Sequence, residues 1–125
     1  MKNNIQKLPD AELDVMLALW DIKAPALRCD IEKALDETHP MAHTTLLTLL
    51  SRLGEKGFIE IKKEGRASTY SPLIKKDEYL SMQGENFFSK ICRGKLSDLA
   101  TALSATGITQ EDFLELKKLI EESER

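Results

Sequence analysis

The stretch from Ala42 to Tyr70 constrains the fold of this 125-residue chain more than any other. Leucines in its first half recur every three or four residues, which predicts an amphipathic helix over about residues 42–56. Its second half passes from an apolar run into a basic tip around Gly65 and continues beyond it, which favours a two-stranded hairpin turning at that glycine. The stretch is therefore predicted to be one helix followed by a hairpin.

The side of this helix opposite the leucines carries hydroxyl and basic side chains. Such groups can hydrogen-bond to base edges and phosphates, so this face is suited to lying in a groove of DNA. Ala42 is a poor capping residue, which leaves backbone donors free for a phosphate at the helix start, where His43 also stands. The predicted DNA-binding residues of the helix and hairpin are His43, Thr44, Thr45, Thr48, Arg52, Lys62, Lys63 and Arg66.

The distribution of charge along the chain favours a nucleic-acid partner for this stretch alone. The whole chain has a net charge of −3, but residues 43–75 hold six Lys/Arg against three Asp/Glu, a net charge of +3. Residues 1–42 hold five against eight and residues 76–125 hold seven against ten, so each has a net charge of −3. Because phosphate contact depends on local charge, the basic stretch is the predicted binding surface for double-stranded DNA.

Two further helices are expected before this stretch. Pro9 and the acidic residues after it favour a first helix, which closes at Trp20 and Ile22, and Trp20 at helical spacing is interpreted as a core residue. A second helix is expected over about Leu27–Glu37, ending before Pro40. Three helices followed by a basic hairpin are the element order of a winged helix-turn-helix, in which the third helix reads DNA and the hairpin is the wing.

The pattern changes in residues 75–125, where three short amphipathic helices are expected, separated by Gly94 and Gly107. The last begins at Thr109, a suitable N-cap with Asp112 three residues later. Helices this short can hardly enclose a core alone, so they are interpreted as an arm that buries its apolar residues against a second copy of the chain. The predicted dimerisation residues are Leu80, Phe87, Phe88, Ile91, Leu96, Leu99, Leu103, Phe113, Leu116, Leu119 and Ile120.

The predicted fold class is mainly α with a small antiparallel β hairpin. Residues 1–74 are expected to form a winged helix-turn-helix DNA-binding domain, and residues 75–125 a helical dimerisation domain. The chain has no apolar run of about 18 residues and no charged leader before an apolar segment. We therefore expect neither a membrane span nor a signal peptide, and a cytoplasmic protein.

No motif for catalysis or metal binding stands out. The sequence has no Gly-rich phosphate loop and no nucleophile elbow, so no catalytic residue and no cofactor are predicted. His39 and His43 have i, i+4 spacing, but Pro40 between them disfavours a shared helix face, and no metal site is predicted. Cys29 and Cys92 form no CxxC pattern and are interpreted as reduced, buried thiols, with a redox role as the alternative.

Motifs spread over nearly the whole chain point to one known family. They are Leu8-x-x-Ala11-Glu12-x-x-Val15-Met16, Trp20, Pro25, Thr44-Thr45-Leu46-x-Thr48-Leu49-Leu50-x-Arg52-Leu53-x-x-Lys56-Gly57 and Glu64-Gly65-Arg66-Ala67-x-x-Tyr70-x-Pro72. Together they resemble the penicillinase-repressor (BlaI/MecI/CopY-type) family, and the likeness is weaker after Lys75. The resemblance implies a homodimeric winged-helix repressor that sits on a palindromic DNA operator and shuts off a resistance operon.

The resemblance also implies roles for residues and partners. Those on the family's recognition helix are Thr44, Thr45, Thr48 and Arg52, and those on its wing are Lys62, Lys63 and Arg66. Copper-sensing members carry a cysteine-rich tail, which this chain lacks, so the resemblance does not imply metal-thiolate sensing. A sensor protease is a further partner of β-lactam-responsive members, but here Thr101-Ala102 stands in place of the Asn-Phe bond cleaved in them.

Two alternatives to a DNA-reading surface stay open. In one, the threonines of the third helix are only a solvated face. In the other, the winged helix serves protein contacts without specific DNA binding, for which the charge of +3 in residues 43–75 is the discriminating feature. A salt-sensitive shift of random DNA favours the DNA binder, and no shift at low salt favours the protein-contact module.

Overall fold

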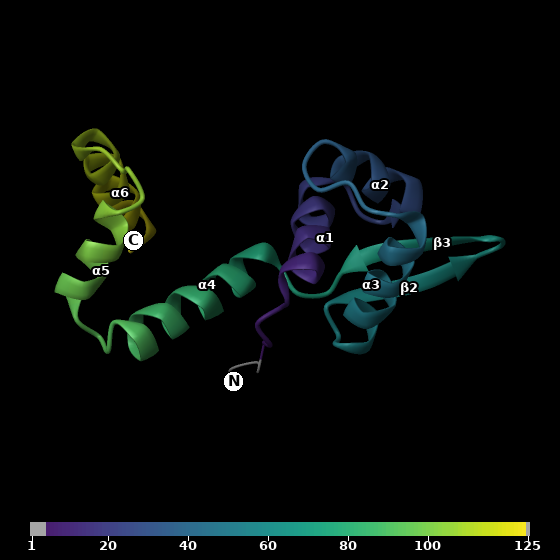
Figure 1. Cartoon of the computed structure of the whole chain (residues 1–125), viewed down its shortest axis with the longest axis horizontal. Coiled ribbons are helices and arrows are strands. Elements are labelled where there is room, and N and C mark those ends of the chain that lie inside the picture. The colour runs from purple at the N-terminus through teal and green to yellow at the C-terminus, as the bar shows by residue number, and fades with distance from the viewer. Residues whose placement is uncertain (1–4, 125) are drawn as a thin grey trace. The chain divides into compact units, whose positions relative to one another are not determined.

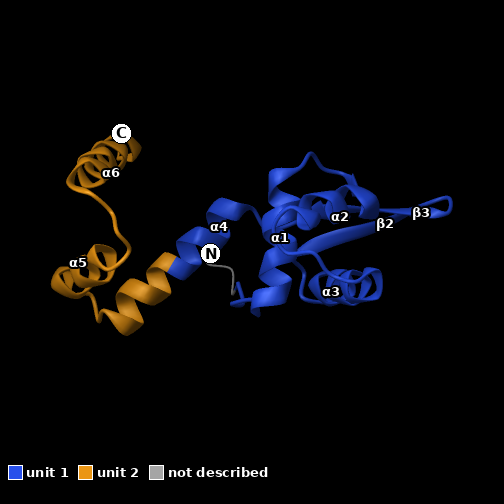
Figure 2. Ribbon diagram, turned by 45° about the horizontal axis from the view of Figure 1, so that its top comes forward, with its two compact units in different colours: residues 1–83 blue, residues 84–125 orange. Residues whose placement is uncertain are grey.

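The computed structural model describes residues 5–124 and contains six α-helices, one π-helical turn and three strands in that range (Figure 1). The chain divides into two compact units, residues 1–83 and residues 84–125 (Figure 2). Within residues 5–124, no helix combines the length and the apolar character needed to cross a membrane.

Three helices open the first unit: α1 (Asp10–Asp21), α2 (Arg28–Asp36) and α3 (His43–Glu55). They confirm the three helices predicted from apolar spacing. Gly57 follows α3 with a φ of 80°, the left-handed conformation expected of a residue that ends a helix. Their apolar faces meet in one core, whose largest fully buried side chains are Phe58, Met16, Leu19, Ile31, Leu35, Leu46, Leu50, Leu53 and Val15.

The predicted hairpin is confirmed, and a third strand joins it. Strands β2 (Ile59–Glu64) and β3 (Ala67–Pro72) pair antiparallel, and Gly65 turns between them with a φ of 66°. A short strand, β1 (Ala26–Leu27), pairs antiparallel with the other edge of β3, where Ala26 lies opposite Tyr70. The sheet order is therefore β1-β3-β2, with the longest strands forming a hairpin that projects beyond the three helices (Figure 1).

One buried charge connects α1 to the end of α3. The side chain of Glu12 is 4% exposed, and its Oε1 accepts a hydrogen bond from Nζ of Lys56. A carboxylate loses its hydration on burial and is retained in a core only with such a partner. The pair therefore fixes the end of α3 against α1.

Helix α4 (Lys76–Asn86) begins on the core of the first unit. The hydroxyl of Tyr79 accepts a hydrogen bond of 2.9 Å from the backbone N–H of Leu8, and its ring centroid lies 5.8 Å from that of Trp20. Nε1 of Trp20 donates to the carbonyl of Ile74 at 2.9 Å, which confirms Trp20 as a packing residue. These contacts explain why the compact unit includes the first turns of α4, while a functional division after residue 74 stays a prediction.

The three helical segments expected after residue 75 are present, and the first of them, α4, begins in the first unit and ends in the second. A π-helical turn, η1 (Phe87–Ile91), continues α4 and was not predicted. Two further helices follow, α5 (Leu96–Ser104) and α6 (Gln110–Ser123). Gly94 and Gly107 separate these segments with φ values of 74° and 83°, as the sequence pattern predicts.

The start of α6 has the capping arrangement predicted from the sequence. Oγ1 of Thr109 accepts a hydrogen bond of 3.1 Å from the backbone N–H of Asp112, and Oδ2 of Asp112 accepts one of 2.9 Å from the backbone N–H of Thr109. This reciprocal pair satisfies two backbone donors that the helix itself leaves unpaired.

The apolar side chains of the second unit are largely exposed. Among residues 84–124 only Cys92 is buried, whereas Leu96 is 73% exposed and Ile91 is 70% exposed. Soluble proteins rarely present a contiguous apolar surface to water unless another surface covers it. The second unit therefore encloses no core of its own.

Candidate nucleic-acid interface

A continuous polar stripe runs along the exposed side of α3. Thr44, Thr48 and Ser51 follow one another at i, i+4 and i+7, so their side chains share one side of the helix. Oγ1 of Thr48 donates to the carbonyl of Thr44 at 3.1 Å, which orients its hydroxyl along the stripe. The opposite side of α3 is buried and consists of Leu46, Leu49, Leu50 and Leu53.

Thr45 and Arg52 lie on one flank of this stripe. They are seven residues apart and both exposed, so they occupy the same side of α3, next to the stripe rather than on it. Among the described residues, the side chain of Arg52 has no hydrogen-bond or ion-pair partner. Its guanidinium donors are therefore free to reach a base or a phosphate at the edge of a groove.

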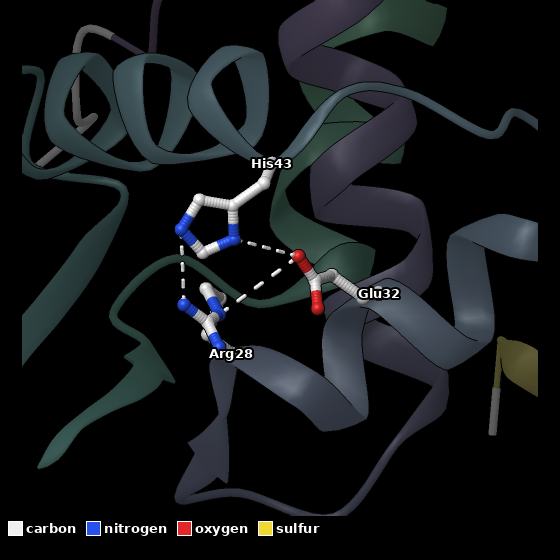
Figure 3. Close-up of polar contacts among 3 residues, drawn as sticks. All are labelled: Arg28, Glu32 and His43. Atoms are coloured by element: carbon white, nitrogen blue, oxygen red, sulfur yellow. Dashed lines mark hydrogen bonds and ion pairs between the residues drawn. The ribbon is translucent and has the colours of Figure 1, made fainter.

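The start of α3 combines a weak cap with a polar cluster. Ala42 makes no side-chain capping hydrogen bond, as predicted. Nδ1 of His43 lies 3.2 Å from Oε2 of Glu32, Nε2 of His43 lies 3.1 Å from Nη1 of Arg28, and Nε of Arg28 lies 3.8 Å from the same Glu32 oxygen (Figure 3). A neutral ring protonated at Nδ1 satisfies both contacts, because Nδ1 then donates and Nε2 accepts. The predicted phosphate contact of His43 therefore competes with a cluster that already joins α2 to α3.

The two wing lysines lie on opposite faces of the hairpin. Lys63 stands opposite Ser68 in the register, one residue from Lys62, and neighbouring side chains in a strand alternate between faces. Ile61, two residues before Lys63, shares its face and approaches α3, since a Cβ built on Gly54 would lie 3.0 Å from its Cδ1. Lys63 therefore projects from the face toward α3 and Lys62 from the other, and both are exposed.

Comparison with known proteins decides the family. The family model described as penicillinase repressor matches residues 8–122. The chain belongs to the penicillinase repressor family. The resemblance inferred from its motifs is thereby confirmed.

Named relatives support this membership over nearly the full length. The chain is 29% identical over 119 residues to the penicillinase repressor of Bacillus licheniformis, covering 94% of this chain and 92% of that relative. It is 26% identical over 121 residues to the methicillin resistance regulatory protein MecI of Staphylococcus aureus (strain N315), covering 96% of this chain and 98% of MecI. This penicillinase repressor family member is thus similar to regulators of antibiotic resistance along most of its sequence.

Two solved structures show the same fold. One is the solution structure of the monomeric form of Bacillus licheniformis BlaI in complex with the blaP half-operator, at 35% identity and a TM-score of 0.51. The other is the solution structure of the DNA-binding domain of the repressor BlaI, at 35% identity and a TM-score of 0.52. Each match covers 63% of this chain and 94% of the solved chain. They confirm the winged helix-turn-helix predicted for this penicillinase repressor family member.

The predicted dimerisation residues of this penicillinase repressor family member are absent from its buried core. Those with half-buried side chains are Phe87, Phe88, Leu99, Leu103 and Phe113. Those with exposed side chains are Leu80, Ile91, Leu96, Leu116, Leu119 and Ile120. Leu114, 68% exposed on α6, adds to this surface although the sequence pattern did not single it out. Exposed apolar side chains are thus available on α4 and in the second unit, as a dimerisation role requires.

The two histidines of this penicillinase repressor family member do not share a site, and its two cysteines differ in burial. Nδ1 of His39 lies 3.7 Å from Oδ1 of Asp14, whereas His43 contacts α2, so the two rings have different partners. The part of the chain that the structure describes contains no group of three His, Cys, Asp or Glu side chains able to hold a metal ion. Cys92 is buried as predicted, but the prediction of a buried Cys29 is wrong, because this residue of the first turn of α2 is exposed.

Proposed function

We propose that this protein is a sequence-specific, DNA-binding transcriptional repressor that acts as a homodimer on a palindromic operator. The polar stripe on α3 beside a basic wing carries this proposal. It is supported by family membership and by the fold that the chain shares with BlaI, which was solved on a half-operator. A helix with a buried leucine face and an exposed hydroxyl face fits the major groove, where hydroxyls can read base edges.

In this proposal the first unit divides its contacts between bases and phosphates. The hydroxyls of Thr44, Thr48 and Ser51 meet base edges, and the flanking Thr45 and Arg52 reach a base or the adjacent backbone. The basic side chains of the wing hold phosphates on either side of the groove, and these are Lys62, Lys63 and Arg66. Arg28 at the start of α2 and His43 at the start of α3 can also donate to DNA. They do so once a phosphate offers a stronger acceptor than the contact between the two side chains provides.

The homodimer in this proposal forms through the second unit. A second copy covers the apolar side chains that one copy leaves exposed, with residues 1–74 binding DNA and residues 75–125 dimerising. Two joined copies read half-sites about one helical turn apart, or a multiple of it, and the bound dimer blocks transcription by occupancy. The names of MecI and of the penicillinase repressor favour a resistance or stress operon as the target.

Cleavage by a sensor protease at Thr101-Ala102 is not part of this proposal. Both residues lie inside α5, and Oγ1 of Thr101 donates to the carbonyl of Ser97 at 3.0 Å. A peptide bond within an intact helix is a poor protease substrate until the helix opens. Release of the operator in this proposal therefore does not depend on cleavage of this bond.

The test is to sequence the DNA that the purified protein retains from sheared genomic fragments. A shared palindrome upstream of one operon is the expected result. A variant with Thr44, Thr48 and Ser51 changed to Ala serves as control, because it keeps the buried face of α3 and should lose the shared palindrome. Recovery of random sequence by the wild type would overturn specific repression and leave the protein-contact module.

Arg52→Ala is expected to weaken specific binding by roughly 1–3 kcal/mol, because the free guanidinium beside the polar stripe contacts a base or a phosphate. Titration of a labelled operator fragment measures the loss. Arg93→Ala, an exposed arginine of the second unit, is the matched control and should bind as the wild type does. Wild-type affinity in the Arg52 variant would remove this residue from the interface.

Lys62→Ala and Lys63→Ala are expected to weaken binding to every DNA sequence alike. Each phosphate contact contributes about 1 to the slope of log affinity against log salt, so each substitution should lower that slope by about 1. Lys33→Ala, which removes an exposed lysine from α2, is the control. Because the two wing lysines lie on opposite faces, an unchanged slope for one of them identifies the face that points away from DNA.

A further inference from the structure

A pocket of about 360 Å³ lies between the start of α2, one side of α3 and strand β3. Leu27 and Arg28 line it at the α2 end, Leu47 lines it from α3, and Arg66 and Ser68 line it from the wing. Gly54 stands seven residues after Leu47 and faces β2, so the same side of α3 faces the wing. The volume is at the lower end of the range for small-molecule pockets, roughly 300–1,000 Å³.

One wall of this pocket is apolar and uncovered. Leu27 is 41% exposed and Leu47 is 39% exposed, although both belong to elements that pack into the core of the first unit. Tyr70 of β3 also lines the pocket. Exposed leucines on two facing elements favour a partner with an apolar body, which a nucleic-acid phosphate does not supply.

One cationic group of the pocket, Arg66, is not paired with a carboxylate of residues 5–124. Arg66 has no hydrogen-bond or ion-pair partner among the described residues, and no carboxylate lines the pocket. Arg28 shares its charge with Glu32 and contacts His43, so it contributes less free charge than Arg66 (Figure 3). A guanidinium binds a carboxylate or phosphate through paired hydrogen bonds, and the nearby hydroxyl of Ser68 can add another.

We propose that this pocket binds a small amphipathic organic anion and that its occupancy lowers the affinity of the protein for DNA. The anionic group lies on Arg66 and Ser68, and the apolar body packs on Leu27 and Leu47. The effect on DNA rests on the proposed function, in which Arg66 holds a phosphate. A ligand that occupies its guanidinium withdraws this contact, so ligand and DNA weaken each other's binding by the same factor.

The first experiment titrates 2-naphthoate, an aromatic carboxylate, into the full chain and follows backbone amide shifts by NMR. Saturable shifts are expected at the amides of Leu47 and Ser68. The matched probe 2-naphthamide has the same rings and no charge, and should bind at least about tenfold more weakly because it lacks the charge-assisted hydrogen bonds. Equal binding of the two probes would overturn recognition of an anion.

Single substitutions locate the site. Arg66→Gln should weaken 2-naphthoate binding at least about tenfold, and Arg28→Gln should weaken it less because its charge is already paired with Glu32. Lys62→Gln removes the same charge from the opposite face of the wing and should leave the affinity unchanged. An unaffected Arg66 variant, or shifts confined to the hollow beside Leu114 on α6, would refute the pocket.

The second experiment measures binding of a mixed-sequence duplex at low salt with 2-naphthoate or with an equal concentration of sodium acetate. Naphthoate should weaken DNA binding several-fold relative to acetate, and this difference should vanish in Arg66→Gln. Unchanged DNA affinity at saturating naphthoate would overturn the regulatory role. Complete failure to bind DNA would refute the proposed function instead, since the NMR titration decides the pocket without any DNA.

Discussion

Changing both Leu116 and Ile120 to Asp should convert the protein to a monomer and lower its affinity for a palindromic operator by about 10²–10⁴-fold. These side chains stand four residues apart on α6, 37% and 50% exposed, so they share one side of the helix. Carboxylates there would lose their hydration in a dimer interface without gaining a partner. Each half-site is then bound by a separate molecule, and the gain from joined copies is lost.

Analytical ultracentrifugation and titration of the operator and of an isolated half-site measure both consequences. Lys118→Asp is the control, because it also brings a carboxylate onto α6 but lies two residues from both Leu116 and Ile120, on the opposite side of the helix from these two side chains. The control should stay dimeric and bind normally. If the Leu116/Ile120 double variant were monomeric and still bound the full operator with wild-type affinity, the joined-copy mechanism would be wrong.

Replacing Lys56 with Ala is expected to cost about 2–3 kcal/mol of the free energy of unfolding. The substitution leaves the carboxylate of Glu12 in the core without its hydrogen-bond donor. Because the side chain of Lys56 is 27% exposed, the expected loss of stability is smaller than for a fully buried ion pair. Urea denaturation followed by circular dichroism measures the change.

Two further variants separate the buried charge from a general effect of losing a lysine. Lys33→Ala, at an exposed position on α2, should leave the stability nearly unchanged. Changing both Glu12 and Lys56 to Leu should recover most of the lost stability, because no unpaired charge is left in the core. A double variant as unstable as Lys56→Ala would show that packing, and not the unpaired carboxylate, determines the loss.

The helices and the hairpin of this protein were predictable because residues close together in the sequence specify each of them. Apolar spacing marks α3, Gly57 ends it, and Gly65 turns the wing, all within a few residues of the feature they specify. Strand β1 escaped prediction because two residues carry no period, and it exists only through pairing with β3, more than 40 residues later along the chain. Burial of Glu12 likewise depends on Lys56, which no local pattern connects to it.

In the candidate site, too, features set by local spacing were predictable from the sequence, and contacts between distant residues were not. Exposure of Thr44 and Thr48 follows from helical spacing, and the same rule, extended by one step, would have included Ser51. Arg28 could not be found in this way, since its contact with His43 crosses 15 residues and a turn. The exposed Leu27 and Leu47 were also hidden, because only the fold brings them to one pocket.

The division of α3 into a buried leucine side and an exposed hydroxyl side has an evolutionary consequence. Substitutions at Thr44, Thr48 or Ser51 change the groups offered to DNA without touching the core, and surface changes of this kind alter stability by only about 0.5 kcal/mol. The basic side chains that are proposed to supply sequence-independent affinity lie on a separate hairpin. If the proposed function holds, descendants of this protein can therefore change the operator that they recognise and still keep both their stability and their sequence-independent affinity for DNA.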